Sequence, residues 1–168
     1  MKIYTAAALC LLGIGQVTQA LRVAILNDLH LNRTYDQSCT FMRCYDRGDY
    51  GSDSPAKLVE TILEDMQKET DHGKKYDAIM IGGDFVVHGL SSDDKDKNNW
   101  SQMKEVIADS MKLIQRYFPD TPILPNIGNN DLLHHYQAPN QTERAMFYGD
   151  LYSLWFDEVK ANQEAVGA

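Results

Sequence analysis

The sequence predicts a layered α/β fold with a parallel sheet, in the order β-α-β-α-β-α. Three apolar runs rich in β-branched residues, at 22–26, 78–81 and 123–127, predict the strands. Two stretches with apolar residues at helical spacing lie between these runs, and a third follows the last one. Strands that alternate with helices in this way are typical of parallel sheets.

A long polar connection, residues 31–54, follows the first strand. A connection of that length inside a compact domain is usually functional or tied down. Ser54 and Pro55 then predict the start of the first helix, as N-cap and first-turn proline. The apolar face of this helix consists of Leu58, Val59, Ile62, Leu63 and Met66.

The second helix is predicted over residues 100–118, and Pro119 and Pro122 separate it from the third strand. One last helix is predicted over residues 141–160. Its buried side chains are expected to be Met146, Leu151, Leu154, Trp155 and Val159.

Polar residues follow each of the three strands, at 28–30, 82–84 and 128–131. The carboxyl ends of parallel strands lie at one edge of a sheet, which is where ligands bind in α/β proteins. Carboxylate, amide and imidazole groups are ligands of divalent transition metals. We therefore expect a metal site formed by Asp28, His30, Asp84 and Asn129.

Each ligand also has a simpler interpretation when it is taken alone. Asp28 could cap a turn, and Asn129 could be a left-handed turn residue beside Gly128. Three ordered clusters at three strand ends are more specific than any one of them, and together they favour the metal site.

The three clusters resemble the first three blocks of the calcineurin-like metallophosphoesterases, written D-x-H, G-D and G-N-H-D/E. The second block, residues 83–88 with His88 at its end, is similar to the acid-sphingomyelinase-like branch. The third block has Asn130 in place of His and His135 further on, and it resembles the endopolyphosphatase branch. The resemblance covers residues 22–150.

This resemblance implies a hydrolase that uses two divalent metal ions, with Zn expected first and Fe or Mn as alternatives. Asp28 and His30 would bind one ion, Asp84 would bridge both, and Asn129 would bind the second. The implied reaction is hydrolysis of a phosphodiester, a phospholipid head group or polyphosphate by a hydroxide held between the two metals.

The resemblance also implies catalytic residues. The family's usual His, which protonates the leaving group, is Asn130 here, and an amide cannot transfer that proton. The endopolyphosphatase-like pattern implies that His135 lies near the site, with Asp131 orienting it or its neighbour His134. The two histidines could equally be ordinary loop residues. His88 is expected as an outer-sphere or substrate contact, or as a simple capping residue beside Gly89.

The N-terminal segment, residues 1–20, has the pattern of a cleaved secretory signal peptide. Cys39 and Cys44 would then be an even pair in an oxidising compartment and could form a disulfide. Three glycosylation sequons begin at Asn32, Asn99 and Asn140. We expect a secreted or lysosomal/vacuolar glycoprotein without a transmembrane span.

The formal net charge of −8 argues against general nucleic-acid binding, which depends on Lys and Arg contacts to phosphates. It does not argue against a phosphorylated small molecule, lipid or polyphosphate, because bound cations reverse the local field.

Family members continue with a second sheet and further His blocks, so residues 21–168 are expected to form a partial, truncated domain, half of the family's sandwich. One sheet face would then be uncovered. The alternative function is a catalytically incomplete secreted glycoprotein that binds a partner chain through this sheet.

Overall fold

The structure is a computed structural model of the chain. It describes residues 21–35, 47–49, 51–71, 75–91 and 99–167. The predicted leader, residues 1–20, and the predicted Cys39–Cys44 pair lie outside the described residues.

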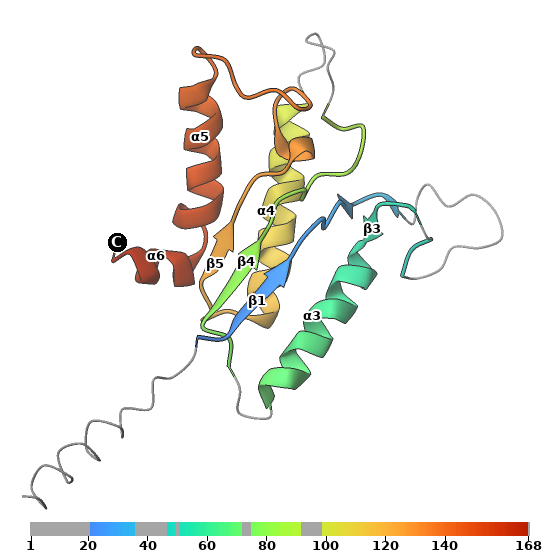
Figure 1. Cartoon of the computed structure of the whole chain (residues 1–168), viewed down its shortest axis with the longest axis vertical. Coiled ribbons are helices and arrows are strands. Elements are labelled where there is room, and N and C mark those ends of the chain that lie inside the picture. Colours follow the sequence, from blue (N-terminus) through green and yellow to red (C-terminus); the bar gives the residue numbers. More distant parts are fainter. Residues whose placement is uncertain (1–20, 36–46, 50, 72–74, 92–98, 168) are drawn as a thin grey trace, which may run out of the picture.

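The main sheet has three parallel strands in the order β1-β4-β5 (Figure 1). They are β1 (Val23–Leu26), β4 (Ala78–Ile81) and β5 (Ile123–Pro125). The predicted parallel α/β arrangement is confirmed, although the third strand ends two residues earlier than expected. A second, two-stranded sheet pairs β2 (Leu31–Asn32) with β3 (Ser54–Pro55).

Two amphipathic helices lie between the main strands, α3 (Ala56–Asp71) and α4 (Trp100–Tyr117). Helix α4 lies behind the sheet in Figure 1, and α3 packs beside it. Ser54 and Pro55 are predicted to begin the first helix, but the helix starts one residue later than predicted, at Ala56. They form β3, where Ser54 N–H donates to the His30 carbonyl, 2.9 Å away.

The core combines apolar side chains from the sheet face that these helices cover, from the helices themselves, from the loops after the strands and from the C-terminal helical region. Among the largest fully buried side chains are Leu63, Ile79, Ile81, Met103, Ile107, Ile114 and Ile123. These residues keep the carboxyl ends of the strands in a fixed register, which positions the loops that follow.

The predicted single helix over residues 141–160 is wrong. The chain instead forms α5 (Arg144–Tyr152), a π-helical turn η2 (Ser153–Asp157) and α6 (Lys160–Val166). Val159 is extended, with φ −108° and ψ 98°, so the helix cannot continue through it. The apolar spacing alone could not reveal this break.

The break is stabilised by Asn162, which is buried in α6. Its side-chain oxygen accepts from the Ile123 N–H and its nitrogen donates to the Ile123 carbonyl, both at 2.7 Å. The same nitrogen donates to the Trp155 carbonyl at 2.7 Å. The amide therefore continues the hydrogen bonding of the edge strand β5 and turns α6 against it.

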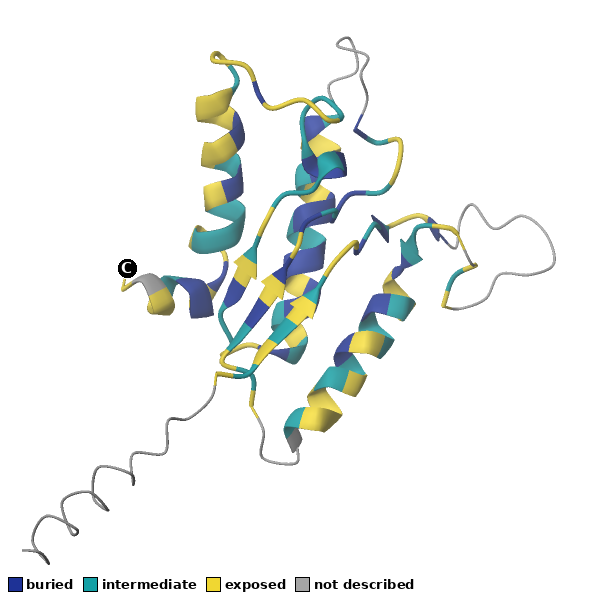
Figure 2. Ribbon diagram, in the orientation of Figure 1, coloured by how far each residue is buried: buried dark blue, intermediate teal, exposed yellow. Residues whose placement is uncertain are grey.

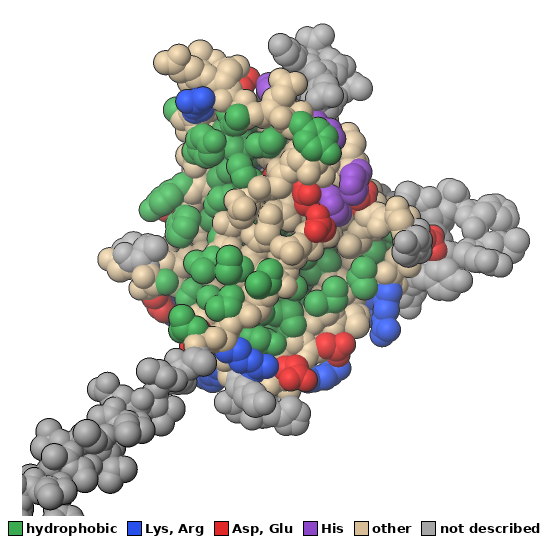
Figure 3. All heavy atoms as spheres, viewed as in Figure 1, with side chains coloured by type: hydrophobic (Ala, Val, Ile, Leu, Met, Phe, Trp, Pro, Cys, Tyr) green, Lys and Arg blue, Asp and Glu red, His purple; other side chains and the backbone are tan. Residues whose placement is uncertain are grey.

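The other face of the main sheet is open. Ile25, Met80 and Leu124 lie opposite one another on the three strands, and their side chains are 65%, 45% and 47% exposed. Figure 2 shows the exposed residues on the strand surfaces, and Figure 3 shows hydrophobic side chains across this face. The expected uncovered face is thus present.

Among the residues that the structure describes, no helix combines the length and the apolar character needed to cross a membrane.

Replacing Asn162 by Ala is expected to lower the free energy of unfolding by about 2–4 kcal/mol, because the buried N–H and carbonyl of Ile123 would lose their partners. Glu164→Ala, an exposed change in the same helix, should stay within about 0.5 kcal/mol of wild type. Urea denaturation measures both, and equal effects would contradict the role given to Asn162.

Candidate metal centre

Three of the four predicted ligands lie together at the carboxyl end of the sheet. Asp28 and His30 follow β1, and Asp84 follows β4. Each side chain offers one ligand atom, a carboxylate oxygen or an imidazole nitrogen, and these three atoms lie within 4.8 Å of one another. Figure 3 shows acidic and histidine side chains side by side beyond the strand ends. Two carboxylates and an imidazole at this spacing fit a divalent transition metal.

The backbone at these positions is unusual. Asp28, His30 and Asp84 have positive φ angles of 52°, 38° and 55°. Among the described residues, Tyr136 is the other non-glycine residue with a positive φ. Such conformations cost about 1–3 kcal/mol each and cluster at functional sites. The fold therefore holds all three side chains at the sheet edge in strained positions.

Hydrogen bonding fixes the orientation of the His30 ring. Its Nδ1 lies 2.8 Å from the Val86 carbonyl oxygen, which can only accept, so Nδ1 carries the proton. In the neutral ring Nε2 then has the lone pair, and it lies 3.9 Å from Oδ1 of Asp28. A histidine that donates through one nitrogen to a carbonyl and offers the other is the usual arrangement in metal ligation.

The loops after β1 and β4 run side by side. Asp28 N–H donates to the Gly83 carbonyl at 3.3 Å, and His30 N–H donates to the Asp84 carbonyl at 2.8 Å. These bonds extend the parallel pairing of the strands beyond their ends and hold the first two ligand loops together.

Asp131 joins the second and third loops. Its side chain is fully buried and accepts from the backbone N–H groups of Asp84, Val86 and Gly128, at 2.7, 3.0 and 2.9 Å. The described structure gives Asp131 no hydrogen bond to His134 or His135, which instead contact Glu143 and Asn129. Asp131 positions the loop that carries Asp84.

Burial raises the pKa of Asp131 from 3.8 to about 6. The three backbone N–H donors act in the opposite direction and limit the increase, while the nearby Asp84 carboxylate adds to it. Removal from water is thus the dominant effect, even with three hydrogen bonds to the carboxylate.

Glycines allow these loops to approach closely. A Cβ on Gly83, whose φ is 105°, would lie 2.2 Å from the Gly128 nitrogen, and one on Gly128 would lie 2.2 Å from Oδ1 of Asp84. A Cβ on Gly82 would lie 1.9 Å from Oδ1 of Asn27. In the described structure the lack of a side chain at these glycines therefore allows neighbouring loops to contact each other.

The third cluster forms a 3₁₀ turn, η1 (Asn129–Asp131), beside Asp84. Asn130 is buried and donates to Oδ1 of Asp84 from its backbone and its side chain, at 2.8 and 3.2 Å. Asn129 lacks the left-handed backbone of the simpler interpretation. The bridging carboxylate expected from the resemblance is thus held by its neighbours.

His135 contacts the site through Asn129. The amide nitrogen of Asn129 lies 3.1 Å from Nε2 of His135 and, carrying only hydrogens, donates to it. This leaves the amide oxygen of Asn129 available to a metal ion. His134 lies apart from this contact, with Nε2 3.2 Å from Oε1 of Glu143.

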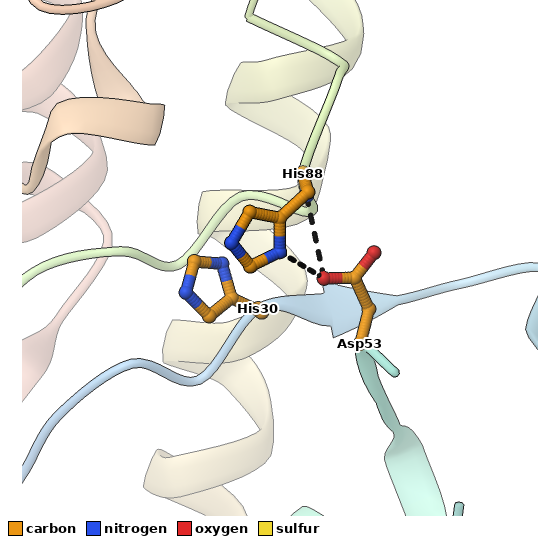
Figure 4. Close-up of side chains that lie close together, drawn as sticks. All are labelled: His30, Asp53 and His88. Carbon is orange, nitrogen blue, oxygen red and sulfur yellow. Dashed lines mark hydrogen bonds and ion pairs between the residues drawn. The ribbon is translucent and has the colours of Figure 1, made fainter. Parts of the chain in front are cut away.

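A second cluster of His30, Asp53 and His88 adjoins the first (Figure 4). The rings of His30 and His88 stack, with centroids 4.1 Å apart. Nδ1 of His88 lies 2.6 Å from Oδ1 of Asp53, which also accepts from the His88 N–H at 3.3 Å. Asp53 could not be predicted as part of this cluster, because no local sequence signal brings the end of the long connection to His88.

This geometry defines an α/β protein with a candidate divalent-metal centre at the tips of its parallel strands. The model of the calcineurin-like phosphoesterase family matches residues 21–164, and the chain belongs to that family.

The chain is also similar to curated proteins from two organisms. It is 28% identical over 116 residues to "Sphingomyelinase phosphodiesterase D" of Dictyostelium discoideum, covering 69% of this chain and 23% of that protein. It is 34% identical over 90 residues to "Sphingomyelinase phosphodiesterase C" of the same organism, covering 54% and 19%. With "Acid sphingomyelinase-like phosphodiesterase 3b" of Mus musculus the identity is 31% over 108 residues, covering 64% and 22%. The chain thus spans less than a quarter of the length of these relatives.

Replacing Gly83 by Ala is expected to destabilise the fold by about 2–4 kcal/mol, because the new Cβ meets backbone and φ is positive. Gly149→Ala is the matched control. Outside its own helix and chain neighbours, no described atom lies within 4 Å of its new Cβ, and alanine in a helix should add about 0.5–1 kcal/mol of stability. A tolerated Gly83→Ala in urea denaturation would contradict the close loop contact.

The raised pKa of Asp131 predicts a pH-dependent stability. The folded chain binds this proton more tightly than the unfolded chain does, so the stabilisation is complete below the unfolded pKa of 3.8 and is lost as pH rises through about 6. The shift corresponds to about 3 kcal/mol at about 1.4 kcal/mol per pKa unit.

Urea denaturation with a chelator present, for wild type and Asp131→Asn, measures this effect. The stability advantage of wild type over the variant should shrink by up to about 3 kcal/mol between about pH 4 and about pH 7. An advantage that is constant or grows with pH would show that burial does not dominate at Asp131.

Proposed function

We propose that the chain carries the first metal-ligand blocks of a metal-dependent phosphoesterase. The observation that supports this most directly is the meeting of Asp28, His30 and Asp84, with ligand atoms within 4.8 Å and all three on left-handed backbone. Structural ion pairs seldom need strained backbone at every member. A cation-binding role for the three side chains explains why the fold maintains the strained backbone at these positions.

In this proposal Asp28 and His30 would hold one divalent ion, Asp84 would contribute its carboxylate to both ions, and Asn129 would offer its amide oxygen to the second. The expected ion is Zn, with Fe or Mn as alternatives, since the ligands are oxygen and imidazole. Bound at this edge, the ions would polarise a phosphate ester and favour deprotonation of water for in-line attack. The protein's part is to fix the ligands, through the Val86 carbonyl for His30 and the backbone and amide of Asn130 for Asp84.

His88 is the residue best placed to contact a bound phosphate beside these ligands. Asp53 holds its Nδ1, so its Nε2 remains available to the substrate. Asn130 cannot transfer a proton, and its side chain is buried against Asp84. His135 is a second candidate, since it contacts Asn129.

The proposed substrate is a phosphodiester such as a phospholipid head group, with polyphosphate as the alternative. The names of the relatives, sphingomyelinase-type phosphodiesterases, favour the lipid class. The third block, with Asn130 and His135, is the feature that supports polyphosphate as the alternative substrate.

The proposed location is a secretory or lysosomal/vacuolar compartment. It rests on the leader-like residues 1–20 and on the three sequons, with Cys39 and Cys44 as a proposed disulfide. Residues 21–168 would then be the mature part of the chain.

Metal titration of the purified chain tests the site. Asp28→Asn and Asp84→Asn keep residues that tolerate a positive φ and remove a carboxylate, so each should weaken Zn or Mn binding by more than about tenfold. Asp53→Asn is the matched control, since its carboxylate contacts His88, and it should leave the affinity near wild type.

The reverse order, with binding lost in Asp53→Asn and kept in the other two variants, would place the metal at His30, Asp53 and His88 instead. Equal metal content in wild type and Asp84→Asn would remove the proposed site. Hydrolysis of bis(4-nitrophenyl) phosphate, measured beside the titration, reports whether the chain turns over a generic phosphodiester.

A second candidate is a non-catalytic half-domain that binds a partner polypeptide. The open sheet face of Ile25, Met80 and Leu124 favours it, because contiguous exposed apolar surface marks interaction sites. A chain that associates in size-exclusion chromatography and takes up neither Zn nor Mn would support this candidate over the enzyme.

A further inference from the structure

We propose that Asn140 carries an N-linked glycan in the folded protein and that Asn99 does not. Both begin sequons, at 140–142 and 99–101. The proposal rests on entry into the secretory pathway. At each site the deciding observation is whether the oxygen or the nitrogen of the asparagine amide is hydrogen-bonded in the folded protein. A glycan is attached to the amide nitrogen and leaves the amide oxygen in place.

The fold uses the oxygen of Asn140. Its Oδ1 accepts from the backbone N–H and hydroxyl of Thr142, at 2.9 and 2.7 Å, and from the Glu143 N–H at 3.2 Å. Glu143 returns a bond, because its Oε2 accepts from the Asn140 N–H at 3.0 Å. This reciprocal pair caps the chain at the entry to α5.

The described structure gives the Asn140 amide nitrogen no hydrogen bond, and the residue is exposed. A sugar on this nitrogen would therefore keep every bond of the cap and extend into solvent. The modification and the fold are compatible at this position.

Asn99 presents the opposite case. Its amide nitrogen donates to the Leu90 carbonyl at 2.7 Å in a partly buried position. The next residue, Trp100, is 4% exposed and packs against Phe147, with ring centroids 4.9 Å apart. A sugar on the Asn99 nitrogen would crowd the junction that anchors the start of α4.

Asn32 resembles Asn140 in that its Oδ1 accepts from the backbone and hydroxyl of Thr34, at 2.9 and 3.2 Å. It is only half-exposed and lies within β2. The clean contrast within this chain is between Asn140 and Asn99.

The test uses the full chain, expressed with its own N-terminus in a eukaryotic secretory host. Treatment with a glycosidase that converts glycosylated Asn to Asp, followed by peptide mass spectrometry, reads each site separately. We expect conversion at Asn140 and none at Asn99. Asn140→Asp removes the sequon and keeps the capping oxygen, so it should lose one glycan. Ser101→Ala removes the other sequon and keeps the Asn99 bond, so it should change nothing.

A glycan on Asn99 of the secreted protein, or an unmodified Asn140 in a chain whose N-terminus is Leu21, would overturn the proposal. A chain that keeps residues 1–20 and carries no glycan would also overturn the proposal, because the chain would not have entered the secretory pathway. The N-terminal residue distinguishes these two failures.

Discussion

The rest of the site depends on the hydrogen bonds that backbone N–H groups donate to the buried carboxylate of Asp131. This carboxylate binds three backbone N–H groups, two from the loop after β4 and one from the loop after β5. Asp84 therefore projects from a segment whose backbone is fixed on both sides. The energy of those bonds is offset in part by removing a carboxylate from water, which is why the pKa of Asp131 is raised.

The same sheet edge concentrates other local costs. Three candidate ligand residues adopt left-handed backbone, and the contact between Gly83 and Gly128 admits no side chain. The apolar core beneath the strands and the hydrogen-bonded loops above them supply the stability that maintains these conformations. This combination is typical of a preorganised binding site, in which the coordinating side chains are in place before the metal ion binds. Membership of the calcineurin-like phosphoesterase family agrees with this view of the strand tips.

Much of this arrangement could be predicted from the sequence, because strands and their following polar residues are local features. Asp28, His30 and Asp84 could be assigned to one edge once the strands were taken as parallel. The contacts that could not be predicted are all tertiary. The Asp53 contact to His88 joins residues on either side of α3 and β4, and the break before α6 depends on Asn162 bonding to β5. Asp131 was expected to face a histidine, and only the folded loops reveal its backbone partners.

The central claim is that Asp28, His30 and Asp84 share a bound cation. Anomalous X-ray diffraction from crystals of the chain grown with Zn or Mn tests it most directly, because the signal locates the ion without assuming its ligands. If the three residues do share a cation, the anomalous peak lies within coordination distance of Nε2 of His30 and of carboxylate oxygens of both aspartates. A peak held by Asp53 and His88 instead, or no peak at the strand tips of a metal-loaded crystal, would contradict it.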